Sequence, residues 1–380
     1  MWRACRSEKS RKGANSGQLT QRRFGCTTAR MHSFSLVTGA TGFVGSQLVR
    51  TLLDRGEYVK ALVRPGSNLD ALVGLPADRF KIAVGDMRIE QSVFAALAGC
   101  TRLYHVAANF KLWDADPARV IAPTVEGMRA TLRAAQQRKL QKIVVTSSAG
   151  VLGVNSAPEP VDESHAFNLK DPEAYFAAKV AADAVVDEFV AAGQPIVRVL
   201  PATIAGPGDW KPTPNGRMLL DYLKTPATSH FPVSGGGINV VDVADVASGH
   251  ALAMDHGAIG DSYILGGENL TFSQIFETLC DLTGLSEPSA PKSKGLLQFA
   301  GALFELNARL RGGEPRITSR LARDYVDAYA YVTSEKAETQ LGYTHRSARE
   351  ALARSVRWFL ANGYVPQKAA ARVRLELRPV

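Results

Sequence analysis

The 380-residue chain has few cysteines and lacks a long apolar run. Its four cysteines, Cys5, Cys26, Cys100 and Cys280, show neither the paired spacing of a disulfide framework nor a C-x-x-C metal pattern. We therefore expect no metal site, and we expect a reducing, cytoplasmic location. No apolar stretch approaches the roughly 18 to 20 residues that a membrane-spanning helix needs. A content of 46% hydrophobic and 21% charged residues is typical of a globular protein with one large core, or one core and a smaller lobe.

The formal charge of +9 is concentrated at the N-terminus. Residues 1–30 contain eight basic side chains against the single acid Glu8, so they contribute +7 and the other 350 residues contribute +2. Because the charges of residues 31–380 nearly balance, the sequence gives little support to nucleic-acid binding, and we expect none. The Arg-, Ser- and Thr-rich leader resembles a transit peptide, but the sequence favours a start codon called too early, with Met31 as the true initiator. Residues 1–32 are expected to be a disordered basic leader in either case.

Short apolar runs alternate with helical patterns from Phe34 onward. Strands are predicted over 34–38, 58–63, 80–84, 102–107, 141–146 and 195–200. Helices are predicted between them, near 43–55, 89–98, 117–139 and 172–192. Apolar strands without alternation, each followed by a helix, indicate an α/β fold with a Rossmann-type, doubly wound parallel sheet that is covered on both faces.

The first predicted strand runs into the glycine-rich sequence VTGATGFVGSQLV. Gly39, Gly42 and Gly45 stand at T-G-x-x-G-x-x-G spacing. Glycines let the backbone approach a pyrophosphate closely, and the following helix directs its N-terminal amides at negative charge. We interpret this stretch as a dinucleotide cradle, and a plain strand-to-helix turn is the alternative.

The pattern of elements changes after Leu200. A stretch rich in proline and glycine precedes shorter elements, with helices expected near 271–284, 293–311, 316–328 and 346–362. We predict an NAD(P)-binding domain over 33–204, to which 237–260 return, and a smaller C-terminal substrate lobe made of 205–236 and 261–364. Residues 365–380 are expected to form a flexible tail.

Arg64 follows the second predicted strand, at the place where an acid would bind the ribose hydroxyls of NAD. An arginine there favours a 2'-phosphate, so NADP(H) is expected over NAD(H). In the alternative interpretation, Arg64 only borders the adenine and both cofactors are accepted.

The sequence PEAYFAAKVAADAVVDEF, residues 172–189, places Tyr175 and Lys179 four residues apart. On a helix these side chains lie on one face, one turn apart. A nearby ammonium, helped by an oxidised nicotinamide, lowers the pKa of a phenol toward the working range of a proton carrier. Ser148, in VVTSSAG after the fifth strand, can hydrogen-bond a carbonyl or alcohol oxygen. Ser148, Tyr175 and Lys179 are the predicted catalytic residues.

These motifs, in this order, resemble the extended branch of the short-chain dehydrogenase/reductase superfamily, which contains the NAD-dependent epimerase/dehydratase family. The resemblance favours Ser148 over its neighbours Ser147 and Thr146 as the substrate-binding hydroxyl. It also implies that Asp86 hydrogen-bonds the adenine amino group and that Tyr175 and Lys179 contact the nicotinamide ribose. Further residues implied at the cofactor are Thr41, Phe43, Val44, Met87, Ala107, Ala108, Pro201 and Thr203.

Two positions near these motifs are not expected to act in catalysis. Thr124 replaces the asparagine that supports the site in this family, which affects the support and not the chemistry. His105 is interpreted as a packed strand residue rather than a catalyst.

Longer strings are similar to the hopanoid-associated sugar epimerase family, a dihydroflavonol-4-reductase-like group: AANFKLWDADP, GPGDWKPTPNGRMLLDYL, INVVDVADVASGHALAM and YILGGENLTFSQI. The resemblance implies an NAD(P)-dependent oxidoreductase that acts at a ketone or secondary alcohol. The alternative is a sugar or nucleotide-sugar epimerase or dehydratase that retains NAD(P), with Arg217, Arg311 and Arg316 as candidate diphosphate ligands. A more remote alternative is a non-catalytic NADP-binding scaffold.

The expected partner is a small ketone, alcohol or sugar derivative. Helices near 117–139 and 172–192 are candidates for a homodimer interface. The amphipathic segment 294–311 could dock on a membrane, although packing on its own domain is favoured.

Overall fold

The computed structural model describes residues 33–108, 110–226, 235–288, 293–315 and 317–374. The leader predicted over 1–32 and the candidate ligand Arg316 lie outside these described residues. Within the ranges that are described, no helix is long and apolar enough to cross a membrane.

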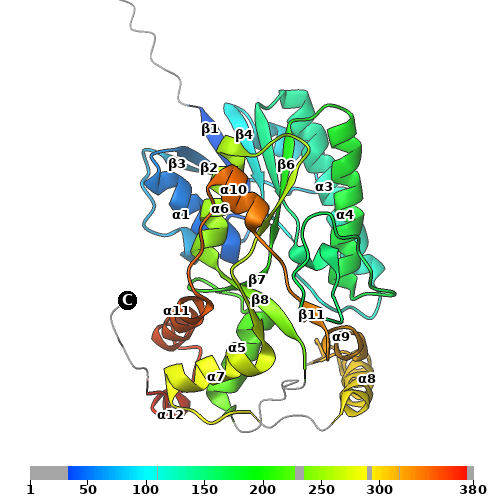
Figure 1. Ribbon diagram of the computed structural model, residues 1–380. Helices are drawn as coiled ribbons and strands as arrows, with labels where there is room; N and C mark the ends of the chain where they lie inside the picture. The colour runs from blue at the N-terminus through cyan, green and yellow to red at the C-terminus, as the bar shows by residue number, and fades with distance from the viewer. Residues whose placement is uncertain (1–32, 109, 227–234, 289–292, 316, 375–380) are drawn as a thin grey trace, which may run out of the picture. The chain divides into compact units, whose positions relative to one another are not determined.

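A seven-stranded parallel sheet forms the larger of two sheets (Figure 1). Its strands are β1 (Phe34–Thr38), β2 (Tyr58–Val63), β3 (Phe80–Val84), β4 (Cys100–His105), β5 (Lys142–Thr146), β6 (Ile196–Pro201) and β9 (Ser262–Leu265). They are arranged in the order β3-β2-β1-β4-β5-β6-β9. The direction of winding reverses between β1 and β4, which places a crevice beyond the carboxyl ends of these strands. The predicted doubly wound Rossmann-type sheet is confirmed.

Helices cover both faces of this sheet. The helices α1 (Phe43–Asp54), α6 (Val243–His256) and α10 (Glu335–Leu341) pack together on one face, and α2 (Glu90–Ala96), α3 (Ala118–Arg138) and α4 (Ala174–Ala191) pack together on the other. Neighbouring strand residues enter different cores, since Leu36 packs with the residues of α3 and α4 while Val37 packs with those of α1 and α6. This two-sided burial explains why the strands are apolar without alternation.

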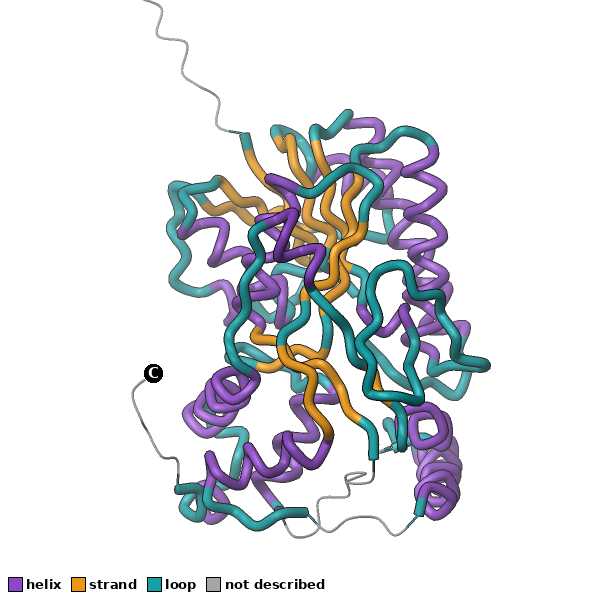
Figure 2. Tube along the Cα trace, viewed as in Figure 1, coloured by secondary structure: helices purple, strands orange, loops and turns teal. Residues whose placement is uncertain are grey.

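A smaller sheet is built around β8 (Gly237–Asp242), which pairs with β7 (Thr203–Ala205), β10 (Glu268–Thr271) and β11 (Tyr329–Ala330) (Figure 2). The helices α5 (Pro214–Lys224), α7 (Phe272–Thr283), α11 (Ala348–Ala361) and α12 (Gln367–Ala370) enclose a separate core with it. Tyr222, Phe276 and Phe359 fill this core. The remaining helices, α8 (Lys294–Arg311) and α9 (Ser319–Tyr325), pack against each other.

The structure differs from the predicted division of the chain at three places. β8 lies in the smaller sheet, although residues 237–260 were expected to return to the nucleotide-binding domain, and only α6 from that range covers the larger sheet. β9 belongs to the larger sheet, although 261–364 were assigned to the lobe. The first part of the expected flexible tail is packed, because Val365 and Ala369, which lie before and within α12, are buried. The division into a nucleotide-binding domain and a substrate lobe otherwise stays a prediction.

Candidate active site

The turn between β1 and α1 has no room for side chains at its glycines. Gly39 has a φ of +68°, and a Cβ added to it would lie 2.7 Å from Cα of Ala107. A Cβ added to Gly45 would lie 2.1 Å from the carbonyl oxygen of Gly39. No described side chain caps α1 at Gly42, so the first-turn amides are left for another acceptor. These features fit a pyrophosphate held by backbone amides at a helix N-terminus.

The loop after β4 is fixed against this turn by Thr38. The Thr38 hydroxyl accepts the Ala107 N–H at 3.2 Å and lies 3.0 Å from Nδ1 of His105. Burial lowers the pKa of His105 to about 3, so the ring is neutral near pH 7. His105 thus holds the neighbouring chain in place, as its interpretation as a packed strand residue predicts. Ala108, one residue further on, is exposed.

Arg64 and Asp86 follow the adjacent strands β2 and β3. The Asp86 carboxylate accepts a hydrogen bond of 2.6 Å from Nη2 of Arg88, and this bond is the main reason why the pKa of Asp86 is lowered. The charge of Arg64 lowers the same pKa further, whereas Arg64 itself is exposed and forms no ion pair with a described residue. Its guanidinium therefore has the accessibility that a phosphate ligand needs. Met87 instead packs beside α3 at Gly127.

Ser148, Tyr175 and Lys179 come together beyond the carboxyl end of β5. The Tyr175 side chain is buried against Phe110, with the ring centroids 4.3 Å apart, and Ser148 lies close enough to its hydroxyl to affect the pKa of that hydroxyl. Lys179, also buried, donates from Nζ to the carbonyl oxygen of Thr146 at 2.8 Å. The structure therefore gathers all three predicted catalytic side chains from β5 and α4.

Burial governs the protonation of this group. It raises the pKa of the Tyr175 hydroxyl, and the hydrogen bond from Ser148 opposes this increase only in part. Burial also lowers the pKa of Lys179 to about 8, opposed by the charge of Asp183. The expectation that the lysine lowers the tyrosine pKa is not met in the protein alone, because desolvation of the phenolate raises the pKa of Tyr175, the charge of Asp183 raises it further, and only Ser148 lowers it.

Asp183 and His250, which the sequence analysis missed, hydrogen-bond to the residues beside Lys179. The Ser147 hydroxyl donates to Asp183 at 2.5 Å, and the Thr146 hydroxyl lies 2.8 Å from Nε2 of His250. Nδ1 of His250 lies 2.7 Å from the carbonyl oxygen of Val246, which can only accept, so Nε2 is the acceptor for Thr146. Asp183 had a local signal, because it lies one turn beyond Lys179 on α4. His250 had none, because it is brought in by α6.

The other predicted residues lie at the edges of this region. Thr41, Phe43 and Val44 are half-buried at the glycine turn, while Pro201 is buried in β6 and Thr203 is half-buried in β7. The Thr124 hydroxyl donates to the carbonyl oxygen of Val120 within its own helix, at 2.7 Å. It therefore does not provide the support that the family asparagine would give.

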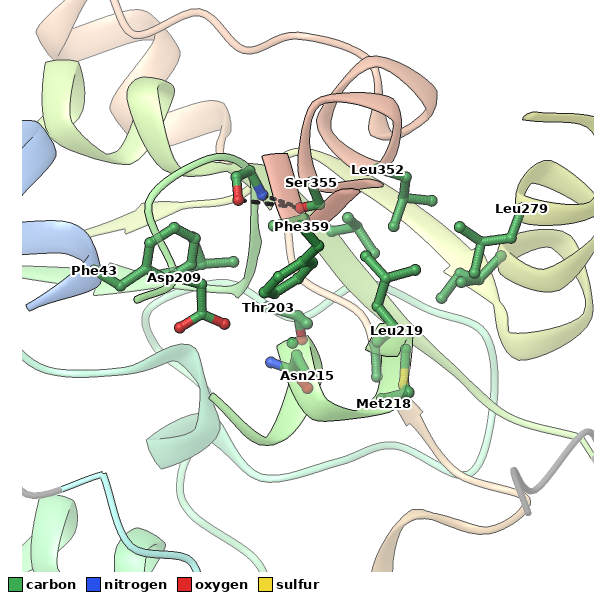
Figure 3. Close-up of a pocket in the computed structure, with 17 residues that line it drawn as sticks. Phe43, Thr203, Asp209, Asn215, Met218, Leu219, Leu279, Leu352, Ser355 and Phe359 are labelled. Atoms are coloured by element: carbon green, nitrogen blue, oxygen red, sulfur yellow. Dashed lines mark hydrogen bonds between the residues drawn. The ribbon is translucent and has the colours of Figure 1, made fainter. Parts of the chain in front are cut away.

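A pocket lies beside the glycine turn (Figure 3). Phe43 and Asp209 stand near one end of it in this view and Leu279 at the other, and its cavity volume is about 30 Å³, which leaves room for only a few water molecules. Asp209 is buried, which raises its pKa to about 6, and it accepts hydrogen bonds from the backbone and side chain of Thr213. Most of the lining is aliphatic or aromatic, and none of the described residues that line it is Lys, Arg or a predicted catalytic residue.

Comparison with known proteins shows which families and chains this sequence and structure resemble. The model of the NAD dependent epimerase/dehydratase family matches residues 35–266. A Synechocystis protein named "Putative dihydroflavonol 4-reductase" is 38% identical, over 87% of this chain and 95% of its own length. Sterol demethylase protein B of Methylococcus capsulatus is 33% identical, over 87% of this chain and 99% of its own. The crystal structure of gox2253 is 35% identical, with a TM-score of 0.74, and the match covers 88% of this chain and 100% of that one.

Proposed function

Because this chain belongs to the NAD dependent epimerase/dehydratase family, we propose that it transfers hydride at a ketone or secondary alcohol, with Ser148, Tyr175 and Lys179 as catalytic residues. The family makes it an NAD(P)-dependent oxidoreductase or epimerase, and the proposal selects the first of these. It is carried by one observation, the placement of the buried Tyr175 side chain next to Ser148 and one helical turn from Lys179.

The protonation states favour reduction of a ketone. The raised pKa keeps Tyr175 protonated, so its hydroxyl can give a proton to the substrate oxygen as negative charge develops there. The Ser148 hydroxyl orients that oxygen, and Lys179 is an ammonium below a pH of about 8, able to hold ribose hydroxyls. The nicotinamide cofactor, bound at Gly39, Gly42 and Gly45, supplies the hydride. Oxidation of an alcohol uses the same residues with the proton moving to Tyr175.

We propose NADP(H) as the preferred cofactor. Arg64 supports this preference because its guanidinium is exposed at the end of β2 and no described acid pairs with it. Asp86 stands close enough to interact with Arg64 but is held by Arg88. An arginine fork binds a phosphate through two parallel hydrogen bonds, and a ribose hydroxyl offers no such partner.

The charge pattern of the candidate diphosphate ligands favours an apolar substrate over a nucleotide sugar. A diphosphate needs basic ligands, but Arg217 forms an ion pair of 3.0 Å with Glu314, and Arg311 lies exposed on α8. The relatives named as reductases and as sterol demethylase protein B support the same choice. The homodimer through α3 and α4 and the cytoplasmic location stay predictions.

A reductase assay tests the proposal. The purified protein, mixed with NADPH and a panel of apolar ketones, should consume the cofactor, seen as a loss of nicotinamide absorbance. Replacing Arg64 with Ala should weaken NADPH binding by about 10- to 100-fold, the effect of losing a charged hydrogen bond, and leave NADH binding unchanged. Arg119→Ala is the matched control, because Arg119 is an exposed arginine at the start of α3.

Three results would contradict parts of the proposal. Tightly retained cofactor, with a sugar substrate epimerised and no net oxidation, would establish the epimerase alternative. Equal use of NADH and NADPH by the unaltered protein would remove the cofactor preference but leave the reaction intact. Cofactor binding without any turnover across ketones, alcohols and sugars would support the scaffold.

A further inference from the structure

The helix α8 has two apolar faces, and only one of them is buried. Leu297, Gly301 and Ala308 face α9, and a Cβ added to Gly301 would lie 2.5 Å from the backbone nitrogen of Ser319. The opposite face carries five large side chains that are more than half exposed: Leu296 (56%), Phe299 (63%), Leu303 (51%), Leu306 (54%) and Leu310 (77%). Packing on its own domain, the favoured expectation from the sequence, therefore accounts for one face only.

These five side chains form a continuous stripe. They are separated by three and four residues in turn, which places them on one side of the helix over its whole length. The other exposed large hydrophobic side chains of the described residues are distributed over several elements, such as Val73, Ile89 and Ile259. Single exposed apolar residues are ordinary, but a stripe of this length marks an interaction surface. We call these five residues the α8 stripe.

The helix that carries the stripe is positively charged. α8 contains Lys294, Arg309 and Arg311 against Glu305, so it carries +2, whereas Arg320 and Arg323 of α9 form ion pairs with Asp171 and Asp324. Arg309 and Arg311 lie near the C-terminal end of the stripe, and neither forms an ion pair with a described residue. Glu305, the one acid of α8, is occupied because it accepts hydrogen bonds from the backbone and hydroxyl of Ser319.

We propose that α8 docks on the surface of an anionic phospholipid bilayer. The α8 stripe would enter the boundary between headgroups and acyl chains, and Arg309 and Arg311 would extend to lipid phosphates. An apolar face bordered by arginines and depleted of free carboxylates has the charge pattern that such a surface attracts. Docking of this kind lays the helix on the membrane and does not require it to span the bilayer.

A second copy of this chain fits the stripe less well. Two α8 helices packed against each other would bring Arg309 and Arg311 toward the partner helix, where no free carboxylate is available to pair with them. A stripe of five side chains also offers less than the roughly 800 Å² per partner of a standard protein interface. The charge pattern therefore selects lipid as the occupant.

The α8–α9 pair is joined to the start of α4, the helix that carries Tyr175. Thr318 donates to Glu173, Arg320 forms a 2.9 Å ion pair with Asp171, and Tyr325 stacks on Phe176. Docking would hold this end of α4 near the membrane, where a lipid-dissolved ketone or alcohol is concentrated. This consequence for the substrate rests on the proposed function, whereas the docking itself does not.

Co-sedimentation of the full-length protein with lipid vesicles tests the docking. Vesicles containing phosphatidylglycerol should bind the protein, and pure phosphatidylcholine vesicles should bind it much less. Phe299→Ser with Leu306→Ser should lower the partition coefficient by about tenfold or more, because two apolar anchors are removed. The matched control is Val73→Ser with Ile259→Ser, which removes two equally exposed apolar side chains elsewhere (68% and 63%) and should leave binding unchanged.

A charge variant tests the role of the arginines. Arg309→Gln with Arg311→Gln should weaken binding to the anionic vesicles by about 30-fold, the effect of two basic side chains at a charged surface. Circular dichroism and thermal unfolding of every variant should match the unaltered protein, since all of the substituted side chains are exposed. The basic leader is present in each variant, so binding driven by the leader would survive these substitutions.

Three outcomes would overturn the docking proposal. The unaltered protein could fail to bind anionic vesicles, or the α8 stripe variant could bind them as well as the unaltered protein does. Sedimentation velocity could instead show a dimer that is lost in the stripe variant while vesicle binding is unchanged, which would assign the stripe to a second copy. Since none of these measurements uses a substrate, a result that contradicts the docking proposal says nothing against the proposed reaction.

Discussion

Burial acts in opposite directions on the two ionisable side chains of α4. A buried phenol resists losing its proton, and a buried ammonium loses its proton more readily, because the charged form of each is poorly solvated. The two side chains therefore lose their protons in different pH ranges: Tyr175 stays protonated well above neutral pH, while Lys179 is half deprotonated at a pH of about 8. Near physiological pH, Tyr175 is therefore a neutral proton donor next to a mostly positively charged Lys179.

The hydroxyl of Tyr175 is the sharpest target for substitution. Tyr175→Phe should lower kcat/KM for ketone reduction by about 10²- to 10⁴-fold, the usual contribution of a positioned proton donor. Nucleotide affinity should change little, because the ring and its contact with Phe110 are retained. Steady-state kinetics and fluorescence titration with NADPH measure the two effects.

Tyr58→Phe is the matched control for this substitution. Tyr58 begins β2, so it lies at the opposite edge of the parallel sheet from the carboxyl ends, and its variant should keep full activity. Unchanged activity in Tyr175→Phe would show that another group transfers the proton.

The pH dependence should report the protonation of Lys179. If the ammonium is required, kcat/KM at saturating NADPH should be constant below a pH of about 8 and fall above it, as Lys179 becomes neutral. Asp183 raises the pKa of Lys179, so Asp183→Asn should move this decline to lower pH. Asp187→Asn, an exposed acid on the same helix, should leave the profile where it is. A profile that does not move in Asp183→Asn would contradict the assignment of the decline to Lys179.

The sequence could predict that Tyr175 and Lys179 lie together because their spacing follows a local rule, which also applies to Asp183. Tyr175, Lys179 and Asp183 repeat every four residues, so one helix is enough to place them on one face. His250 and Phe110 contact this group from other elements, and no spacing in the sequence connects them to α4. The sequence also could not predict that the pKa of Tyr175 is raised, because this shift depends on how much protein surrounds the hydroxyl.

The glycine turn and α1 act as one element, and close contact within the turn fixes its shape. Gly45→Ala would bring a Cβ to 2.1 Å from the Gly39 oxygen, so the backbone must move by roughly 1 Å to restore an ordinary contact. A displacement of that size at a cofactor site should lower kcat/KM by about 10²-fold and weaken nucleotide binding.

A second glycine provides the comparison. Gly295 lies in the first turn of α8 with nothing within 4 Å of an added Cβ, so Gly295→Ala should be neutral or should stabilise the fold by up to about 1 kcal/mol. Isothermal titration with NADPH and thermal unfolding distinguish the two variants. Normal nucleotide affinity in Gly45→Ala would mean that the cofactor does not bind at this turn.

Elements with strong periodicity were predicted to within two residues, including β1, β2, β3 and α1. Most of the elements that were missed are short or lie in the Pro- and Gly-rich part of the chain, as for β7, α5 and β11, but the 14-residue helix α6 was also missed. The conformation of such elements depends on partners far along the chain. For example, β11 has only two residues, and it is a strand because it pairs with β8.

On the scale of the whole molecule, a bound nucleotide should stabilise the folded chain. Any ligand that binds only the native state adds free energy of unfolding, about 2.7 kcal/mol at a concentration of 100 Kd. For a body of this size that corresponds to a rise in Tm of about 4 °C. Differential scanning fluorimetry with NADP+ and with NAD+ at equal concentration measures it, and NADP+ should give the larger shift. No shift with either nucleotide would argue against the crevice at β1 and β4 as a cofactor site.

The sequence alone determined the features that depend on neighbours a few residues apart. The uninterrupted apolar strands specified the doubly wound sheet, and glycine spacing and the periodicity of α4 specified the tight turn after β1 and the shared face of Tyr175 and Lys179, because each rests on local geometry. Only the tertiary structure decided which side of a helix is covered and which strand joins which sheet. The α8 stripe is exposed because α9 occupies the opposite face, and β9 completes the larger sheet because it pairs with β6. Burial, pairing and charge pattern of this kind arise between segments far apart in the chain, where no spacing in the sequence records them.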